Sequence, residues 1–584
     1  MLDDTLMEEK SQTAFTTRIV SHPMYALTLV VVATGLAWSG ALLVGFSTDD
    51  YIFIQHLAPI RSLADVFRPF VDFDPNPQYW RPLADASAAL DFYLWGWSGQ
   101  GFHLSNFLLH LLGTALVYPF SRRIFGLSVS ASLVTALVFG LAASHESNVL
   151  WPAARADTLV TIFTILTILA HKRAFGGPKQ LVWMLASAVS FWFALCSKEN
   201  GVLLLPLLLA ALEIPELLTR KTTWRASLLR MAPYILIGIA FYITRSHFAT
   251  PMSNAEPIVS EGSSSIAAFL RNGIYSLAYT FVPLNLDAAT ATLKSLSGWL
   301  YVFAALAAVA ATTLFLQFPR QRRLNYVLPL VFMLIAGVVT MQSFERWRLY
   351  MPSIGSYTLL VLLITDCWRR WEQPIVRGAL FLTVALLTFF HIERAQTAQS
   401  NWKLAAEEVQ RMKESLKSVL NAHPQRPISL NLISVPAKLG SASVMAVALP
   451  EFVRQCEAER LNGPGLRYGS ADGAPINVER AIDVYALDLS EGFSGMSWRR
   501  DSTGATIIET PSDSHVLLEP ALFKLHGVSR RDWKLTDGDT LNVWSNKVTI
   551  LKADGSFARS VRVQPRSTGA LQLLFDGKRF IVLE

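Results

Sequence analysis

The sequence predicts a polytopic α-helical membrane protein that ends in an α+β domain. Three observations lead to this fold class. The 584 residues are 52% hydrophobic and only 16% charged, which is too apolar a balance for a set of soluble domains. Apolar stretches of the length that crosses a bilayer recur up to residue 391. After residue 392 they give way to short strand-like runs separated by turn residues.

We expect about eleven spans, together roughly 220 residues, because each crossing takes about 20 mostly apolar residues. The first stretch is too long for a removed signal peptide and lacks the small-residue cleavage pattern, so we expect it to stay as a span. The approximate ranges are 25–46, 104–120, 128–144, 156–171, 181–196, 200–214, 231–247, 298–317, 325–342, 353–367 and 376–391.

Basic residues fall in alternate connections between these spans, so the formal charge of +7 is a signal of topology and not of nucleic-acid binding. The fifteen residues are Arg122, Arg123, Lys172, Arg173, Lys179, Arg220, Lys221, Arg225, Arg230, Arg320, Arg322, Arg323, Arg369, Arg370 and Arg377. The positive-inside rule makes their side cytoplasmic. The tail 1–24 is then cytoplasmic, and the loop 47–103, the loop 248–297 and everything after 392 are extracytoplasmic.

The segment 264–284 can also be read as a span. It carries Arg271 and Asn272 in its middle. We expect it to be re-entrant or interfacial, because a full crossing would break the charge alternation that follows.

Residues 392–584 are expected to form a separate extracytoplasmic domain, following the transmembrane domain 25–391. The first part, NWKLAAEEVQRMKESLKSVL, has helical apolar spacing. The strand-like runs are ISLNLISV, DTLNVWS, KVTILKA, ARSVRVQ, LQLLF and RFIVLE. Three cysteines in the whole chain exclude a disulfide framework and a cysteine-based zinc site.

Two adjacent acids follow the first span, in STDDYIFIQH. Asp49 and Asp50 are thereby placed at the outer membrane boundary, where a carboxylate can stay hydrated yet face a lipid-borne substrate. A general base must lie within hydrogen-bond reach of the hydroxyl that it deprotonates. The alternative is that the acids only end the span in water, and the pair alone does not decide between the two.

Further charged residues lie at the outer span ends, where short connections otherwise carry almost no basic residues. They are Arg155, Asp157, Lys198, Glu199, Arg346 and Arg348. Charged side chains near lipid are costly, so these are candidates for binding a phosphate. The alternative is ion pairing between helices, such as Arg155 with Asp157. Arg81 is a phosphate ligand or a surface anchor. His103 is a further candidate for binding the substrate and shares a helical face with Asn106 and His110. The alternative is that the residues of this face hydrogen-bond to neighbouring helices.

Several motifs in one order resemble a known family. The acids are followed by WRPL, FHLSNFLLHLLGTALVY, SHESNVLWPAARADTL, CSKENGVLLLP and RLYMPSIG. Together they resemble the membrane part of the transmembrane O-mannosyltransferases that carry tetratricopeptide repeats, and their bacterial relatives, over roughly residues 25–391. These enzymes belong to the GT-C class of polyprenyl-phosphate-dependent glycosyltransferases.

The resemblance implies an acidic catalytic base in the first outer loop. Asp49 is the first choice, with Asp50 orienting the acceptor or sharing a proton, although the order could be reversed. It also implies transfer of a hexose or pentose from a polyprenyl phosphate, usually with inversion, to a protein, lipid or polysaccharide acceptor at the outer, periplasmic face. The expected location is a bacterial inner membrane.

The chain departs from the family at several points. His145-Glu146 stands where relatives tend to have His-Pro, and HESNV lacks the second histidine of a zinc-protease helix, so we expect neither metal nor cofactor. Two arginines stand before the Tyr-x-Pro-Ser stretch where relatives have one, and the repeat-bearing tail is missing.

Two other functions stay open. A non-catalytic transporter or flippase of lipid-linked glycans would more often show two related halves, and no internal duplication is visible. A scaffold with a degenerate enzyme part would not need to keep both acids.

Overall fold

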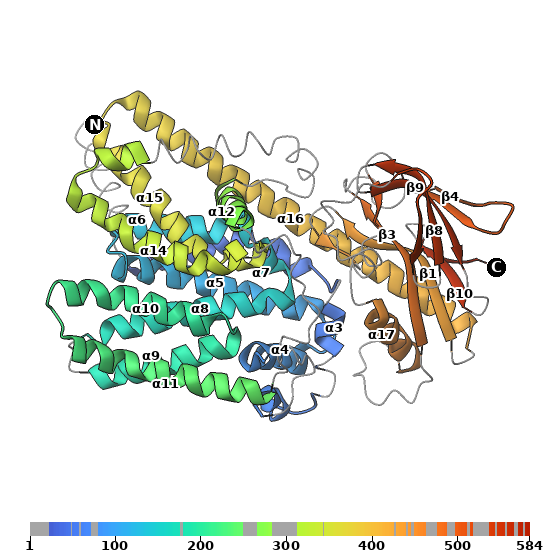
Figure 1. The fold of residues 1–584 in the computed structure, drawn as a ribbon, viewed down its shortest axis with the longest axis horizontal. Helices are drawn as coiled ribbons and strands as arrows, with labels where there is room; N and C mark the ends of the chain where they lie inside the picture. Colours follow the sequence, from blue (N-terminus) through green and yellow to red (C-terminus); the bar gives the residue numbers. More distant parts are fainter. Residues whose placement is uncertain are drawn as a thin grey trace, which may run out of the picture.

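The fold is that of a computed structural model, which describes residues 23–583 apart from internal gaps. The gaps are 48–49, 56, 58–59, 72–79, 176–178, 249–265, 283–311, 343, 425–427, 440–441, 445–448, 463–475, 487–496, 511–513, 518–535, 544–545, 555–556, 566–569 and 576–578. Helices pack side by side in one half of the molecule, and the strands gather in the other (Figure 1). One long helix, α16, runs from the first half into the second.

Described helices overlap the predicted spans from α2, which has only 15 residues where 25–46 was expected, to the start of α16, but the expected number of eleven spans is not confirmed. The helices of the first half are α2 Pro23–Ala37, α4 Pro82–Trp95, α5 Gly99–Arg123, α6 Val129–Leu141, α7 Glu146–Leu150, α8 Arg155–Arg173, α9 Gln180–Ser197, α10 Gly201–Leu218, α11 Trp224–Phe248, α12 Ile266–Phe281, α14 Arg320–Gln342 and α15 Pro352–Arg370. Most of the predicted span 298–317 lies outside the described residues.

Among the described residues, six helices are long and apolar enough to cross a membrane. The number is seven if α6 and the bent segment Ala143–Leu150 that follows it count as one broken span. The chain is therefore a multi-pass membrane protein. Such helices leave apolar side chains exposed on their outer surface, for example Leu236 at 66% and Phe381 at 69%. Lipid would cover these side chains.

The segment 264–284 contains the helix α12, which packs against α14. Of the two polar residues in its middle, Asn272 has a hydrogen-bond partner on another helix. Asn272 is buried, and its Nδ2 donates to the carbonyl oxygen of Met341 at 3.1 Å, at the end of α14. Asn272 is thus accommodated by another helix rather than by solvent.

Helix α16, Pro374–Ala422, has 49 residues and continues through position 392, where the sequence analysis placed a domain boundary. No glycine or proline occurs from Ala379 to Ala422, so nothing in the sequence breaks the helix. The last predicted span and the predicted helix of the tail are therefore one element. It gives a continuous connection from the membrane half to the sheet.

The described tail contains one mixed sheet and one further helix, α17 Leu449–Asn462. All six predicted strand runs are strands, and the sequence analysis missed β2 to β6 and α17. The strands are β1 Ile428–Leu439, β2 Ala442–Ser443, β3 Ile476–Ala486, β4 Ser497–Arg500, β5 Thr506–Glu509, β6 Ser514–Leu517, β7 Thr540–Val543, β8 Asn546–Asp554, β9 Phe557–Pro565, β10 Leu571–Phe575 and β11 Phe580–Leu583.

The sheet has the order β11-β10-β1-β3-β6-β9-β5-β4, with β2 beside β1 and β8 joining β7 to β9. Strand β1 is parallel to β10 and β3, and the other pairs are antiparallel. Alternate side chains serve different cores, as the pleat requires. Leu573 and Phe575 of β10 face α16 and α17, whereas Leu574 joins a cluster with Ile433 and Val561.

The core that includes α16 and α17 does not stop at the tail. The same buried cluster contains Trp38 and Tyr51 from the first half, Trp402 of α16 and Phe452 of α17. We call it the shared core. The end of the helices next to it is called the tail-side end below.

Candidate functional site

The first loop begins at the tail-side end with the short helix α3, Asp50–Gln55. Asp49 lies outside the described residues. Asp50 is fully buried, and its Oδ2 accepts from the backbone N–H of Ser47 at 2.9 Å. A carboxylate at the first residue of a helix is favourably placed for the backbone donors there. The hydrated carboxylate that the sequence analysis expected at this position is therefore not what the structure has.

The residue after Asp50 fixes α3 against the tail. The Tyr51 ring meets Phe452 of α17 edge-on, with 5.2 Å between ring centroids. Burial, and then the nearby Cys456, Glu459 and Asp50, raise the pKa of the Tyr51 hydroxyl well above its usual value. Tyr51 therefore remains neutral, and the loop that carries the two acids is held by an aromatic contact with the tail.

Arg155, the first residue of α8, is the centre of a buried network. It is 1% exposed, and its Nη2 lies 2.5 Å from Asp91 Oδ2. Its Nε donates to Asn106 Oδ1 at 2.8 Å, and its Nη2 to the Phe102 carbonyl at 3.2 Å. The alternative ion pair of Arg155 with Asp157 is therefore wrong, because α4 supplies the carboxylate. Burial raises the pKa of Asp91 despite this arginine.

Two more predicted residues are paired across helices. Lys198 Nζ, at the end of α9, donates to Asp157 Oδ2 of α8 at 2.5 Å, and both side chains are buried. Arg81, just before α4, binds Glu199 with two parallel hydrogen bonds of 2.8 and 2.6 Å. Burial acts to raise the pKa of Glu199, but Arg81 outweighs it and the pKa falls to about 2. Each of these cations has a carboxylate beside it.

A third group of charged residues at the tail-side end comes from α7, η7 and α16. Arg346 Nη1, in the short helix η7 Arg346–Leu349, lies 2.5 Å from Glu146 Oε1. Arg394 of α16 approaches the other oxygen of Glu146, with Nη2 at 3.8 Å from Oε2. The side chains of Glu146 and Arg394 are both buried. Arg348 is half-buried, and its carbonyl accepts from Thr340 Oγ1 at 3.3 Å.

The polar face of α5 hydrogen-bonds to its neighbours. His103 Nε2 lies 3.2 Å from the Gly45 carbonyl, next to the loop with the two acids. His110 Nδ1 lies 2.9 Å from the Tyr350 hydroxyl. His110 also lies 3.1 Å from the Gly140 carbonyl of α6 through its Nε2, so it contacts a neighbouring helix, whereas His103 contacts the segment before α3.

Asparagines connect the clusters into one polar layer. Asn106 Nδ2 donates to the Trp151 carbonyl at 3.0 Å, while its Oδ1 holds Arg155. Asn148 Nδ2 donates to the Trp347 carbonyl at 3.2 Å, next to Arg346. The predicted residues of α5, α8 and η7 are thus brought to the same end of the helices, where the shared core and the first loop also lie.

The sequence analysis missed three members of this layer: Asp91, Glu146 and Arg394. Asp91 stands in an amphipathic segment that gave no sign of its partner, and Glu146 was noted only as a departure from a motif. Arg394 could have been found, because it follows the last predicted span at 391 and is a cation on the outer side. It was assigned to the tail instead.

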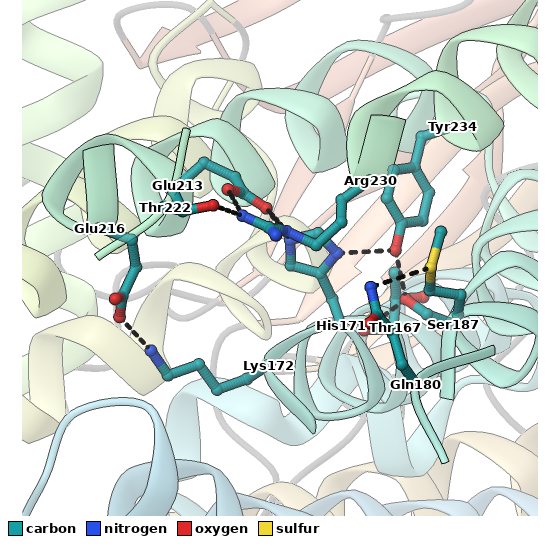
Figure 2. Close-up of polar contacts among 11 residues, drawn as sticks. Thr167, His171, Lys172, Gln180, Ser187, Glu213, Glu216, Thr222, Arg230 and Tyr234 are labelled. Atoms are coloured by element: carbon teal, nitrogen blue, oxygen red, sulfur yellow. Dashed lines mark hydrogen bonds and ion pairs between the residues drawn. The ribbon is translucent and has the colours of Figure 1, made fainter. Parts of the chain in front are cut away.

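A separate polar cluster lies at the opposite end of the same helices (Figure 2). His171 of α8 lies between Tyr234 and Glu213, with 2.9 Å to the hydroxyl and 3.0 Å to Oε1. Arg230 binds Glu213 with hydrogen bonds of 2.8 and 2.7 Å, and Ser187 of α9 reaches Tyr234 at 2.7 Å. Arg230, counted above as a topology signal, is buried. This network clamps α8, α9, α10 and α11 together.

The described residues contain no group of three or more His, Cys, Asp or Glu side chains that could hold a metal ion. The polar groups that this layer presents are carboxylates, guanidinium groups, an ammonium group, imidazoles and amides.

Residues 76–248 match the model of the family described as dolichyl-phosphate-mannose-protein mannosyltransferase. The predicted resemblance is confirmed. This segment contains α4 to α11, and with them Arg81, Asp91, Arg155, Asp157, Lys198 and Glu199. The match covers less than half of the chain.

Curated relatives resemble a part of the chain. Protein O-mannosyl-transferase TMTC4 of Homo sapiens is 31% identical over 147 residues, which are 22% of this chain and 20% of that protein. Protein O-mannosyl-transferase Tmtc2 of Drosophila melanogaster is 32% identical over 129 residues, 21% of this chain and 14% of that protein. The chain thus spans a fifth or less of the length of these relatives.

Two solved structures align with most of the chain at low identity. ArnT from Cupriavidus metallidurans bound to undecaprenyl phosphate has a TM-score of 0.43 at 13% identity, covering 79% of this chain and 92% of that chain. The oligosaccharyltransferase AglB from Archaeoglobus fulgidus, in complex with an inhibitory peptide and a dolichol-phosphate, has a TM-score of 0.41 at 10% identity, covering 85% and 75%. At these scores the likeness decides nothing about this chain.

Proposed function

We propose that the protein is an inverting GT-C glycosyltransferase that moves a sugar from a polyprenyl phosphate to a hydroxyl acceptor at the outer face of a bacterial inner membrane. The observation that carries the proposal is the family match over residues 76–248, the segment that contributes Arg155, Lys198 and their buried partners to the tail-side end. The names of the relatives support mannose as the first sugar to test and protein as the first acceptor.

In the proposed reaction Asp49 or Asp50 removes the proton of the acceptor hydroxyl. The hydroxyl oxygen attacks the sugar carbon from the face opposite the phosphate, the bond between that carbon and the phosphate oxygen breaks, and the lipid phosphate leaves. A single displacement of this kind inverts the configuration at the sugar carbon. Negative charge grows on the leaving phosphate, so nearby cations lower the barrier.

The contacts of the buried Asp50 bear on which of the two acids is the base. Asp50 already accepts a hydrogen bond from the Ser47 N–H within its own loop. A residue so engaged is suited to fixing the loop or orienting the acceptor. This supports Asp49 as the base and Asp50 as the residue that orients the acceptor.

The proposed orientation puts the N-terminus in the cytoplasm and the tail 392–584 outside, on the same side as the site. Helix α16 supports this arrangement, because it leads directly from the last predicted span to the sheet. The tail-side end, with Asp50 and the buried cations, is then the outer end, and the cluster of Figure 2 is at the cytoplasmic end.

The proposal is tested with purified protein in liposomes that contain radiolabelled polyprenyl-phosphate mannose and a peptide acceptor rich in serine and threonine. We expect release of polyprenyl phosphate together with transfer of the label. Asp49→Asn should abolish both without loss of folding, because the amide cannot take the proton. Asp65→Asn is the matched control, since Asp65 is an acid of the same loop whose carboxylate accepts hydrogen bonds from the backbone N–H groups of Arg61 and Ser62.

Full turnover by the double variant Asp49→Asn, Asp50→Asn would overturn the assignment of the base. A transporter gives a different result in the same liposomes. The label would cross the bilayer while still attached to its lipid, with no release of polyprenyl phosphate.

A further inference from the structure

Most cations of the tail-side end lie beside a carboxylate of their own, whether they are buried or, like Arg81, partly buried. Arg155 has Asp91 at 2.5 Å, Lys198 has Asp157 at 2.5 Å, and Arg81 has Glu199. A phosphate that approached these three would have to displace a carboxylate or lie next to one. Their charge is already largely neutralised, which weakens their attraction for a second anion.

Glu146 is shared between two arginines. Arg346 takes its Oε1 at 2.5 Å, and Arg394 comes only to within 3.8 Å of its Oε2, beyond hydrogen-bond distance. The side chain of Arg394 is 7% exposed. In the described part of the chain its Nη2 is buried without a hydrogen-bond partner. A buried guanidinium nitrogen without a hydrogen-bond acceptor is costly, and an anion with a free oxygen would supply that acceptor.

The helix around Arg394 gives no packing reason for a cation there. The buried residues of α16 at this level are His391, Arg394, Ala395, Ala398, Gln399, Asn401 and Trp402, and Arg394 is the one arginine or lysine among them. Ala395, Ala398 and Trp402 lie in the shared core, which also contains Tyr51, the neighbour of Asp50. Arg394 therefore places a buried positive charge beside Glu146, on a helix face that also contributes to the shared core.

We propose that Arg394, together with Arg346, binds the phosphate of the lipid donor and of the lipid phosphate product. This inference rests on the proposed function. A planar guanidinium can hold two phosphate oxygens at once, and a phosphodiester brings the acceptor atoms that Arg394 Nη2 lacks. As the sugar leaves, the phosphate gains a second negative charge, so the interaction grows stronger along the reaction.

The test separates binding from turnover. Polyprenyl phosphate, which carries no sugar, is titrated against the wild-type protein in detergent while thermal unfolding is recorded, with inorganic phosphate in a parallel arm. We expect the lipid phosphate to raise the melting temperature and inorganic phosphate to have no effect at the same concentration. Arg394→Gln should weaken lipid phosphate binding roughly 10- to 100-fold, as expected for the loss of charge-assisted hydrogen bonds.

Kinetics give the second readout. Arg394→Gln should raise the KM for the donor and leave the KM for the acceptor unchanged, whereas Arg394→Lys should keep part of the affinity because it retains the charge. Arg411→Gln is the matched control, an arginine of the same helix that is exposed and paired with Glu408. If Arg394→Gln does not fold, Arg394→Lys carries the test, with a loss of several-fold expected because the planar fork is gone.

The outcomes distinguish the two proposals. Unchanged lipid phosphate binding in Arg394→Gln and Arg394→Lys, with a wild-type protein that binds and turns over, would overturn the inference and leave the proposed function standing. A wild-type protein that binds polyprenyl phosphate through Arg394 but transfers no sugar would refute the proposed function alone. An increased acceptor KM with unchanged donor binding would assign Arg394 to the acceptor and also refute the inference.

Discussion

At the scale of single residues, the tail-side end depends on buried ion pairs whose partners come from different helices. The Arg155 and Asp91 side chains are 2% and 5% exposed. The cost of desolvating both charges offsets much of their attraction, so the intact pair adds little net stability. Removal of one partner is different, because it leaves the other charge buried and uncompensated.

We therefore predict that Asp91→Asn lowers the free energy of unfolding by about 3–5 kcal/mol, the range for breaking a buried ion pair. Arg155 would keep Asn106 and the Phe102 carbonyl but lose its carboxylate. The double variant Asp91→Asn, Arg155→Met should be more stable than Asp91→Asn alone, because it removes the stranded charge. Unfolding in a detergent titration measures all three proteins.

An exposed pair of the same loop serves as the control. Arg68 and Asp65 are joined at 2.9 Å with Arg68 53% exposed, and Arg68→Met should change stability by only about 0–1 kcal/mol. Equal losses in Asp91→Asn and Arg68→Met would contradict the buried-pair argument.

The candidate cations at the outer span ends could be picked out from the sequence, but the carboxylates that pair with them could not. Arg155, Lys198 and Arg346 were recognised because basic residues are rare at that side. Asp91 could not be assigned to Arg155, 64 positions away, because the contact depends on how α4 docks on α5 and α8. The pair considered from the sequence was Arg155 with Asp157, but Asp157 accepts a hydrogen bond from Lys198 instead.

At the scale of elements, the Arg81–Glu199 pair ties the start of α4 to the turn between α9 and α10. In the folded protein the pKa of Glu199 is about 2, below its ordinary value of 4.5, because Arg81 outweighs burial. A lowered folded pKa contributes stability that is complete above the ordinary pKa and is lost as the pH falls toward the folded one. Between pH 5 and 8 this contribution is constant.

We predict that Arg81→Gln destabilises the protein most at neutral pH and less as the pH falls below about 5. Without Arg81, burial raises the pKa of Glu199, and protonation at low pH relieves the buried carboxylate. Melting temperatures of wild type and variant across pH 4 to 8 measure the effect. In a Glu199→Gln background, Arg81→Gln should lower the melting temperature by an amount that does not depend on pH. A pH-dependent loss in that background would refute this account.

The helices themselves were largely predictable, since long apolar stretches have few other structures available to them. The tail was less so. Strands with an uninterrupted apolar pattern were predicted, whereas the missed strands include β3, INVERAIDVYA, in which charged residues interrupt the apolar ones, and β4, SWRR. The continuity of α16 was missed because its composition changes from apolar to charged after His391, although no residue there ends a helix. The change in composition after His391 indicates that α16 leaves the apolar surroundings, but it does not indicate that the helix ends there.

At the scale of the whole molecule, the membrane half and the tail are not independent units. The shared core joins Trp38 and Tyr51 of the first half to Trp402 of α16 and Phe452 of α17. Buried apolar surface of this kind is lost on both sides if either part unfolds, so the two should unfold together. This coupling also explains why α3, with Asp50, is supported by the tail.

Three buried cysteines allow this to be measured without added labels: Cys196 in α9, Cys367 in α15 and Cys456 in α17. With Cys367→Ala as background, we predict that Cys196 and Cys456 become reactive toward a thiol reagent over the same temperature range. Trp402→Ala, which removes a large side chain from the shared core, should lower both temperatures and expose Cys456 first. Lys403→Ala is the control, because the neighbouring Lys403 side chain is 48% exposed and packs in no core. Labelling of Cys456 far below the temperature at which Cys196 reacts in the Cys367→Ala protein would show that the tail unfolds alone, and that it does not hold the first loop in place.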